Sequence, residues 1–155
     1  MDTPNLVNKL DLDNPDVNGN GRGDSGQTGA GGFFKAADEA YDTIRASKTD
    51  VVDIARNTGI KPENIEKVKN HLFINEHILD RYVDLGIPAD RARFDSDIKI
   101  AESWKRLETG THTSEDIQLL RHEVAERWVE IQRNCGYCEA HDRASINFPA
   151  PDWWQ

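Results

Sequence analysis

The sequence predicts an all-α fold: one compact bundle of about five or six helices behind a disordered leader rich in Gly, Asn and Asp. Apolar side chains recur at helical spacing from Phe34 onward, with little of the alternation typical of strands, and seven of the eleven glycines lie in residues 1–32. A chain of 155 residues with 37% apolar content is long enough for one core and too short for two. We therefore expect a leader over residues 1–32 and a single domain over residues 33–155.

The leader has few apolar groups, so it cannot bury enough surface to offset the entropy that is lost on ordering. We expect it to be a flexible leader or a linker between domains. Residues 16–21 have the form of the start of a calcium loop, with oxygen ligands at alternate positions before a glycine. The twelfth position is Gln27 instead of a bidentate Glu, and no helical pattern precedes the loop, which favours a polar linker over a calcium site.

The first three helices are expected over residues 34–46, 50–57 and 62–79, where apolar side chains recur every three or four positions. Gly59 suits the left-handed residue that follows a helix end, and Pro62 suits the first turn of the third helix because that turn needs no backbone N–H. These three helices form the first half of the predicted bundle.

A loop over residues 80–93 is expected to separate the two halves, and Asp95 or Ser96 can cap the next helix by accepting from its first amides. Gly110 is expected to end that helix. A last helix is expected from about residue 137 to 148, and residues 149–155 are expected to dock on the bundle, because two adjacent indoles left in water would form an apolar patch.

The longest helix is expected to begin at a capping box of Thr113 and Asp116, and at 100° per residue it has three sectors. An apolar sector predicts the main core face: Ile117, Leu120, Val124, Trp128 and Ile131. A charged sector is expected to face solvent: Asp116, Glu123, Arg127 and Glu130. His122 and Glu126 project to the third sector, flanked by Leu119 and Val129, and are expected to be partly buried.

Two further histidines are expected to point toward packed surfaces. His71 projects away from the apolar face of its helix, and His141 lies on the small-residue side of the last helix. An imidazole beside a carboxylate can act as a general base or as half of a metal site, because it titrates near neutral pH. The alternative is a core histidine that is hydrogen-bonded to a neighbouring Glu. His77 and His112 are expected to be structural or on the surface.

The order His122-Glu123-x-x-Glu126 is similar to the metallopeptidase helix His-Glu-x-x-His, in which two ligands one turn apart bind zinc and the intervening Glu acts on water. Here a Glu replaces the second His, and Glu123 is expected to face solvent, so the match is partial. A looser prediction is that His122, Glu126 and His141 supply a mixed nitrogen and oxygen set for Zn, Mn or Mg.

Two other motifs are considered. Cys135-x-x-Cys138 with His141 could donate to a structural zinc, or act as a redox pair, but a fourth ligand and a preceding strand are both missing. Residues 51–72 have the layout of a helix-turn-helix, whose second helix would offer DNA a set of polar side chains: Lys61, Asn64, Lys67, Lys69 and Asn70. Packing of a helix hairpin is the alternative.

The formal charge of −9 and the pI near 5.0 disfavour indiscriminate binding of nucleic acid through a basic surface, although a local site can still bind phosphate. No apolar run approaches the roughly 20 residues of a membrane span, and the start of the chain lacks the plan of a signal peptide. We therefore expect a soluble chain with no membrane span.

From about residue 41 to 151 the chain resembles a module found at the C-terminal ends of Rhs and other polymorphic bacterial toxins and on phage head-morphogenesis proteins. The residues that carry the resemblance are Asp53-Ile54-Ala55-x-Asn57-Thr58-Gly59, Asn70-His71-Leu72-Phe73 with His77, Arg93-Phe94-Asp95-x-Asp97, Ala101-x-x-Trp104-x-Arg106-Leu107, His122-Glu123-x-x-Glu126, and Ala140-His141. The cysteine pair is not part of this pattern.

The resemblance implies an antibacterial effector domain that is secreted as part of a larger carrier protein, acts in the cytoplasm of a competing cell, and is neutralised in its maker by a cognate immunity protein. On this basis we expect a hydrolase that cleaves phosphodiester bonds in nucleic acid. His122 and His141 are expected to act as acid and base or as ligands, Glu126 to orient or ligate, and His71 with Arg93 to contact phosphate. The alternatives are a metal-dependent hydrolase or peptidase, and a non-enzymatic helix-turn-helix or phage-structural module.

Overall fold

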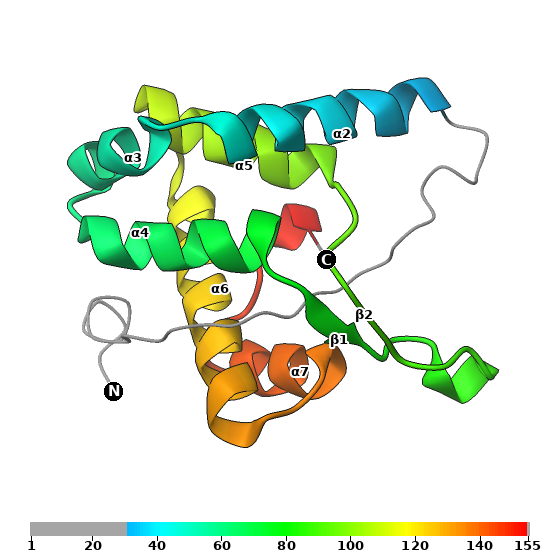
Figure 1. Cartoon of the computed structure of the whole chain (residues 1–155). Coiled ribbons are helices and arrows are strands. Elements are labelled where there is room, and N and C mark those ends of the chain that lie inside the picture. The colour runs from blue at the N-terminus through cyan, green and yellow to red at the C-terminus, as the bar shows by residue number, and fades with distance from the viewer. Residues whose placement is uncertain (1–30, 155) are drawn as a thin grey trace.

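The structure, a computed structural model, describes residues 31–154, with side chains from Phe34 onward. Within this range six α-helices and one short two-stranded sheet form the fold, so the predicted all-α class is confirmed (Figure 1). No helix in the described range is long and apolar enough to cross a bilayer. The predicted leader and its candidate calcium loop lie outside the described residues, apart from the two glycines that open helix α2.

The helices agree with the predicted ones to within a few residues, except after Lys69. The α-helices are α2 (Gly31–Ala46), α3 (Asp50–Thr58), α4 (Pro62–Lys69), α5 (Ile98–Thr109), α6 (Ser114–Arg133) and α7 (Tyr137–Asn147). The shorter elements are the π-turn η2 (Asn70–Ile74), the strands β1 (His77–Leu79) and β2 (Asp90–Ala92), and the 3₁₀ turns η3 (Val83–Leu85) and η4 (Asp152–Trp154).

The helix predicted over residues 62–79 ends at Ile74 instead, and the prediction of its last turn was wrong. Arg45 and Arg93 donate through Nε to the carbonyl oxygens of Phe73 and Ile74, which satisfies groups that a further helical turn would have used. The chain then becomes extended at Asn75 and enters β1.

The loop predicted over residues 80–93 is part of an antiparallel hairpin. His77 pairs with Ala92, Ile78 with Arg91 and Leu79 with Asp90. The hairpin arm projects away from the helices, and its tip lies beyond η3 (Figure 1). One consequence is that His77 sits on a strand, where it faces the core, instead of on the last turn of a helix.

The predicted helix ends hold in most cases. Gly59 and Gly110 adopt the left-handed conformation after α3 and α5, with φ of 78° and 79°. The side chain of Asp97, and not Asp95 or Ser96, caps α5 by accepting from the amides of Lys99 and Ile100. The prediction was therefore right about a capping Asp and wrong about its position by one or two residues.

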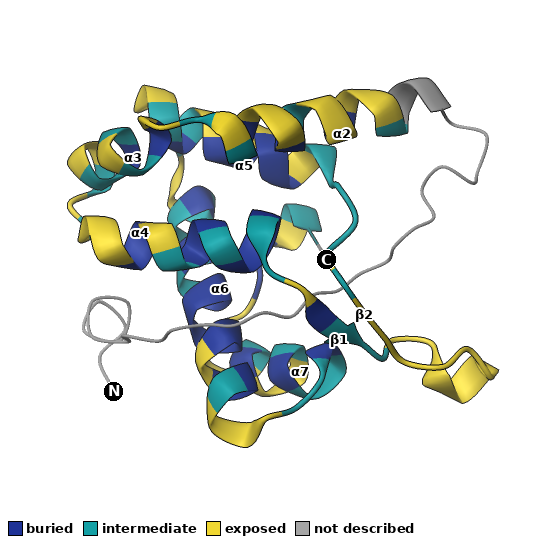
Figure 2. Cartoon of the chain, in the orientation of Figure 1, coloured by how far each residue is buried: buried dark blue, intermediate teal, exposed yellow. Residues whose placement is uncertain are grey.

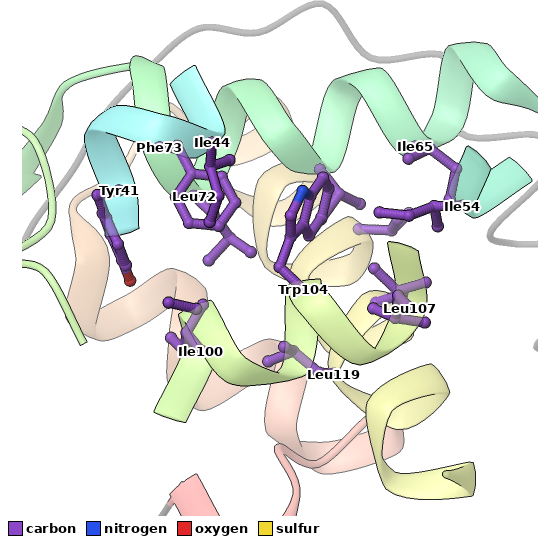
Figure 3. Packing of buried hydrophobic residues seen from close by; sticks show 14 of the residues in the cluster. Tyr41, Ile44, Ile54, Ile65, Leu72, Phe73, Ile100, Trp104, Leu107 and Leu119 are labelled. Atoms are coloured by element: carbon purple, nitrogen blue, oxygen red, sulfur yellow. The ribbon is translucent and has the colours of Figure 1, made fainter. Parts of the chain in front are cut away.

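The core lies between α5 and the helices α2, α3, α4 and α6, with the indole of Trp104 at its centre (Figure 3). Trp104 is fully buried and packs edge-on against Phe73. Its Nε1 donates to Asp50 Oδ2 over 3.0 Å, and Lys69 Nζ donates to Asp50 Oδ1 over 2.9 Å. This buried ion pair ties α3 and α4 to α5, because each of the three residues comes from a different helix.

Helix α6 is buried on more sides than its sequence predicts. It packs against α7, α4, α5 and η2, and both its apolar and its charged sectors are enclosed (Figure 2). The expected core residue Trp128 is 41% exposed, whereas the sector predicted to face solvent is buried: Asp116, Glu123, Arg127 and Glu130. That prediction was wrong, because charged side chains were assumed to need water, whereas other elements cover this sector and supply partners to Asp116 and Glu130.

The tail docks on the bundle, as predicted, for the residues described. Trp154 Nε1 donates to Asp97 Oδ2 over 3.2 Å, and Gln118 Nε2 donates to the carbonyl oxygen of Pro149 over 3.0 Å. Ala150 and Pro151 are buried. Docking brings the Trp154 indole against two of the candidate site histidines.

Asp116 is the main anchor at the start of α6. It completes the predicted capping box with Thr113, and its carboxylate also accepts from Ser103 over 2.6 Å and from Arg106 over 2.7 and 2.8 Å. Burial alone would raise its pKa, but the bonds from Arg106 and Ser103 lower the pKa to about 2.

We expect Asp116→Ala to lower the free energy of unfolding by about 2 kcal/mol, because it leaves the buried Ser103 hydroxyl, the half-exposed Arg106 and a helix end without their acceptor. The folded carboxyl titrates below its ordinary pKa, so this stabilisation is full above about pH 4 and is lost as the pH falls toward 2. Urea titrations of both proteins from pH 7 to pH 2.5 measure it, with the exposed Asp84→Ala as control. A difference that does not change with pH would contradict this role.

Candidate functional site

Helix α6 carries the two residues on which the candidate site is built. His122 and Glu126 lie one turn apart and are fully buried. Helix α7 packs against α6 on one side, and α4 with η2 packs on another. Histidines from both neighbours therefore approach the same stretch of α6.

Three donor atoms converge where α6 meets α7. His141 Nδ1 lies 3.0 Å from Glu126 Oε2 and 3.2 Å from His122 Nε2, and His122 Nε2 lies 3.3 Å from Glu126 Oε2. We call these three atoms the first donor set. They are the residues that the sequence proposed as metal ligands, and the structure brings them together.

The spacing of the first donor set fits the ligand shell of a small divalent ion. Zinc bonds to imidazole and carboxylate at about 2.0–2.1 Å, so two donors of a tetrahedron lie about 3.3 Å apart. Hydrogen bonds have similar lengths, but they need protons. Here His141 Nδ1 also lies 3.3 Å from Tyr137 Oη, so the contacts around this nitrogen outnumber the one proton that it can carry.

The orientation of His122 is fixed by a backbone contact. Its Nδ1 lies 2.7 Å from the carbonyl oxygen of Phe148, which can only accept, so Nδ1 carries the proton. A neutral His122 then presents the Nε2 lone pair to Glu126 and His141. Metal-ligating histidines are commonly held by such a contact from the second ring nitrogen.

His71 reaches the opposite oxygen of the same carboxylate. Its Nε2 lies 2.8 Å from Glu126 Oε1, and its ring is 1% exposed. His71 belongs to the π-turn η2, in which the amide of Asn75 donates to the carbonyl oxygen of Asn70 over 2.7 Å. Single π-turns are rare and are often found at functional sites. The four predicted residues His71, His122, Glu126 and His141 therefore meet in one cluster.

His77 extends the cluster and was missed as a partner. It was predicted to be structural or on the surface; it is fully buried, so a surface position is wrong. Its Nε2 donates to the carbonyl oxygen of His71 over 2.8 Å, and its Nδ1 lies 2.9 Å from Glu130 Oε2. Its ring stacks on Phe94. No local pattern could have shown this, because His77 comes from a strand whose pairing was not predicted.

The predicted position of Glu123 was also wrong. It was expected to face solvent, yet it is fully buried, and neither carboxylate oxygen has a hydrogen-bond partner among the described residues. Its Oε1 lies 3.5 Å from His71 Nε2. Burial of Glu123 removes one of the two differences from the metallopeptidase helix; the other, a Glu in place of the second His, stays.

The pKa values of the Glu123 and Glu126 carboxyls are shifted in opposite directions. Burial, together with the charge of Glu126, raises the pKa of Glu123 well above its ordinary value. Burial would also raise the pKa of Glu126, but its close polar contacts with His122, His141 and His71 hold it well below its ordinary value. Burial lowers the pKa of His71, whereas the hydrogen bond and charge of Glu126 outweigh burial at His141 and raise its pKa. Such divergent pairs are typical of acid–base sites.

A pocket of about 240 Å³ adjoins the cluster. Tyr137 and Trp154 line it and contact the imidazole of His141, Tyr137 by stacking and Trp154 edge-on. His141 has a side chain that is 28% exposed, whereas those of His71 and His122 are 1% or less exposed. The three residues of the first donor set do not line the pocket themselves; Tyr137 and Trp154 separate it from His141, the most exposed of the three.

Arg81 is the cation at this pocket, and sequence reasoning missed it. Its guanidinium donates to Tyr137 Oη over 3.1 Å and lies over the Tyr137 ring. The structure does not bring Arg93, the predicted phosphate ligand, into the cluster. Arg93 is exposed and donates to the carbonyl oxygen of Ile74 on the side of Arg45.

Comparison with known proteins identifies no relative. No family model, no curated protein and no solved structure matches this chain. What the site does is therefore argued from its own geometry.

The other sequence motifs are not drawn into this site. Cys135 and Cys138 are free and half-buried, and neither belongs to a group of possible metal ligands among the described residues. In the helix-turn-helix alternative, Asn64 and Lys69 were to face DNA; both are buried, and Lys69 pairs with Asp50.

Proposed function

We propose that the chain is a metal-dependent hydrolase that acts as an antibacterial effector domain and cleaves phosphodiester bonds in nucleic acid. The observation that carries the proposal is the first donor set: two imidazole nitrogens and one carboxylate oxygen, within 3.0–3.3 Å of one another. The effector role, the carrier protein and the immunity protein rest on the resemblance to polymorphic toxins alone.

The donor chemistry suits a borderline divalent ion. Two imidazoles with one carboxylate favour Zn²⁺ or Mn²⁺ over Mg²⁺, which prefers oxygen ligands. His122, Glu126 and His141 would hold the ion, with Phe148 fixing His122 through its carbonyl oxygen. When bound, such an ion supplies a Lewis acid that polarises the scissile group and activates water.

The pocket beside His141 would take the substrate. Arg81 lines this pocket together with Asp95 and Asp97, and its guanidinium would meet a phosphate there, since a guanidinium donates to two oxygens at once. Aromatic side chains form much of the wall and offer surfaces on which a base can stack: Tyr82, Phe94, Tyr137 and Trp154. The charge of −9 disfavours a long duplex, so a single-stranded or exposed nucleotide is the better substrate class.

Growth of bacteria that express the full chain tests the proposal. Wild type is expected to stop growth and to fragment RNA or DNA, whereas His122→Ala is expected to be harmless. His112→Ala, a half-buried histidine outside the cluster, is the matched control and should stay toxic. If a folded His122→Ala variant kills as well as wild type, His122 is a core residue and the proposal fails.

A peptidase is the second candidate. The specific observation in its favour is that Glu123, which follows the ligand His122, is buried beside Glu126, so His-Glu-x-x-Glu places a carboxyl close to the ligand pair. Toxicity with intact DNA and RNA, together with cleavage of cell protein or cell wall that a chelator stops, would favour this candidate over the nuclease.

A further inference from the structure

Glu126 presents its two oxygens to two different groups of ligands. Oε2 faces His122 and His141, while Oε1 lies 2.8 Å from His71 Nε2. On the Oε1 side lies Glu123, and one donor atom from each of His71, Glu123 and Glu126 falls within 4.8 Å of the others. We call His71 Nε2, Glu123 Oε1 and Glu126 Oε1 the second donor set.

Glu123 is the unexplained member of this set. It is fully buried, and both its oxygens lack a hydrogen-bond partner within residues 34–154. Burying a carboxyl without a partner costs several kcal/mol, so proteins rarely keep one without a use. The single N–H that His71 can aim at this side already lies 2.8 Å from Glu126 and is 3.5 Å from Glu123. One proton donor thus serves two carboxyls.

His71 is braced from behind like a metal ligand. Its Nδ1 lies 3.6 Å from Glu130 Oε1, and the other oxygen of Glu130 lies 2.9 Å from His77 Nδ1. His77 in turn donates to the backbone carbonyl of His71. Carboxylates placed behind a ligating imidazole fix its ring and its tautomer.

We propose that the second donor set is a second divalent-cation position, so that Glu126 bridges two ions and the centre is dinuclear. The inference rests on the proposed function and adds that the site binds two metal ions. One imidazole and two carboxylates are a harder set than the first, which favours Mn²⁺ or Mg²⁺ at this position. Hydrolytic sites with two ions hold them about 3.5–4 Å apart, a span that one bridging carboxylate covers.

Manganese binding to the full chain tests the inference. Metal-stripped wild type is expected to bind two Mn²⁺ per chain in a calorimetric titration, and its electron paramagnetic resonance spectrum is expected to show two coupled ions. Glu123→Gln keeps the shape and removes the charge, so it is expected to bind one Mn²⁺ without coupling. Glu102→Gln, on the exposed side of α5, is the matched control and should bind two.

The outcomes separate the two proposals. One ion in wild type and one in Glu123→Gln overturns the second position and leaves the first intact. No bound ion in wild type overturns both. Unfolding titrations in the presence of a chelator show whether the substitution itself destabilises the fold. Without metal, Glu123→Gln is expected to be at least as stable as wild type, because the buried carboxyl is gone. A Glu123→Gln variant that is less stable with chelator and still binds two ions assigns Glu123 to the core and sinks the inference.

Discussion

Glu126→Gln is expected to lower the proposed hydrolytic activity by about 10³-fold or more, which corresponds to about 4 kcal/mol of transition-state stabilisation. Glu126 contacts three imidazoles, His71 through Oε1 and His122 and His141 through Oε2. An amide of the same shape lacks the charge that these contacts and a bound ion require. In growth assays the variant is therefore expected to be harmless.

The glutamine variant is chosen because it can fold. Glu126→Ala would leave the buried His71 and the half-buried His141 without their acceptor, which costs about 3–5 kcal/mol and confuses loss of chemistry with loss of structure. Circular dichroism and a urea titration check that Glu126→Gln is folded, and Glu102→Gln is the control for a Glu that faces water. Full activity in a folded Glu126→Gln protein would show that the cluster is structural.

Trp104→Ala is expected to have the largest effect on stability, a loss of about 4–5 kcal/mol in the free energy of unfolding. The change removes the largest fully buried side chain, and it also takes the Nε1 donor from Asp50. Many domains have only about 5–15 kcal/mol of stability. A loss of this size is therefore expected to leave the variant protein unfolded, or close to unfolding, at 37 °C.

Trp104→Phe separates the two contributions. It keeps most of the ring in the core and removes the donor, so it is expected to lose about 1–3 kcal/mol, the cost of leaving a buried acceptor unmet. Urea titrations of the three proteins at pH 7 measure both differences. A loss below about 1 kcal/mol for Trp104→Ala would contradict the central position of the indole.

Much of the fold follows from helical periodicity and helix ends. The spacing of apolar residues predicted six helices, and Gly59, Gly110 and the Thr113–Asp116 capping box placed their ends. The strands β1 and β2 were not predicted, because each spans three residues and is held by a partner more than ten residues away. Pairing of that kind leaves no periodic signal in so short a segment.

The candidate site was predicted only in part, because the sequence shows which residues share a helix but not which distant segments pack against it. His122 and Glu126 were found because they share one helix, where the spacing of one turn fixes their neighbourhood. Glu123 and Glu130 were assigned to solvent because the helix alone cannot show that His71 and His77 arrive from η2 and β1 to cover them. Contacts between distant segments decide burial, and those contacts are absent from a pattern of one helix.

X-ray diffraction at the zinc absorption edge, from crystals of the full chain soaked in zinc, tests the central claim most directly. We predict an anomalous peak at about 2.0–2.2 Å from His122 Nε2, His141 Nδ1 and Glu126 Oε2. A crystal in which these three atoms keep their 3.0–3.3 Å contacts, with no peak between them, would contradict the claim that the first donor set is a metal site.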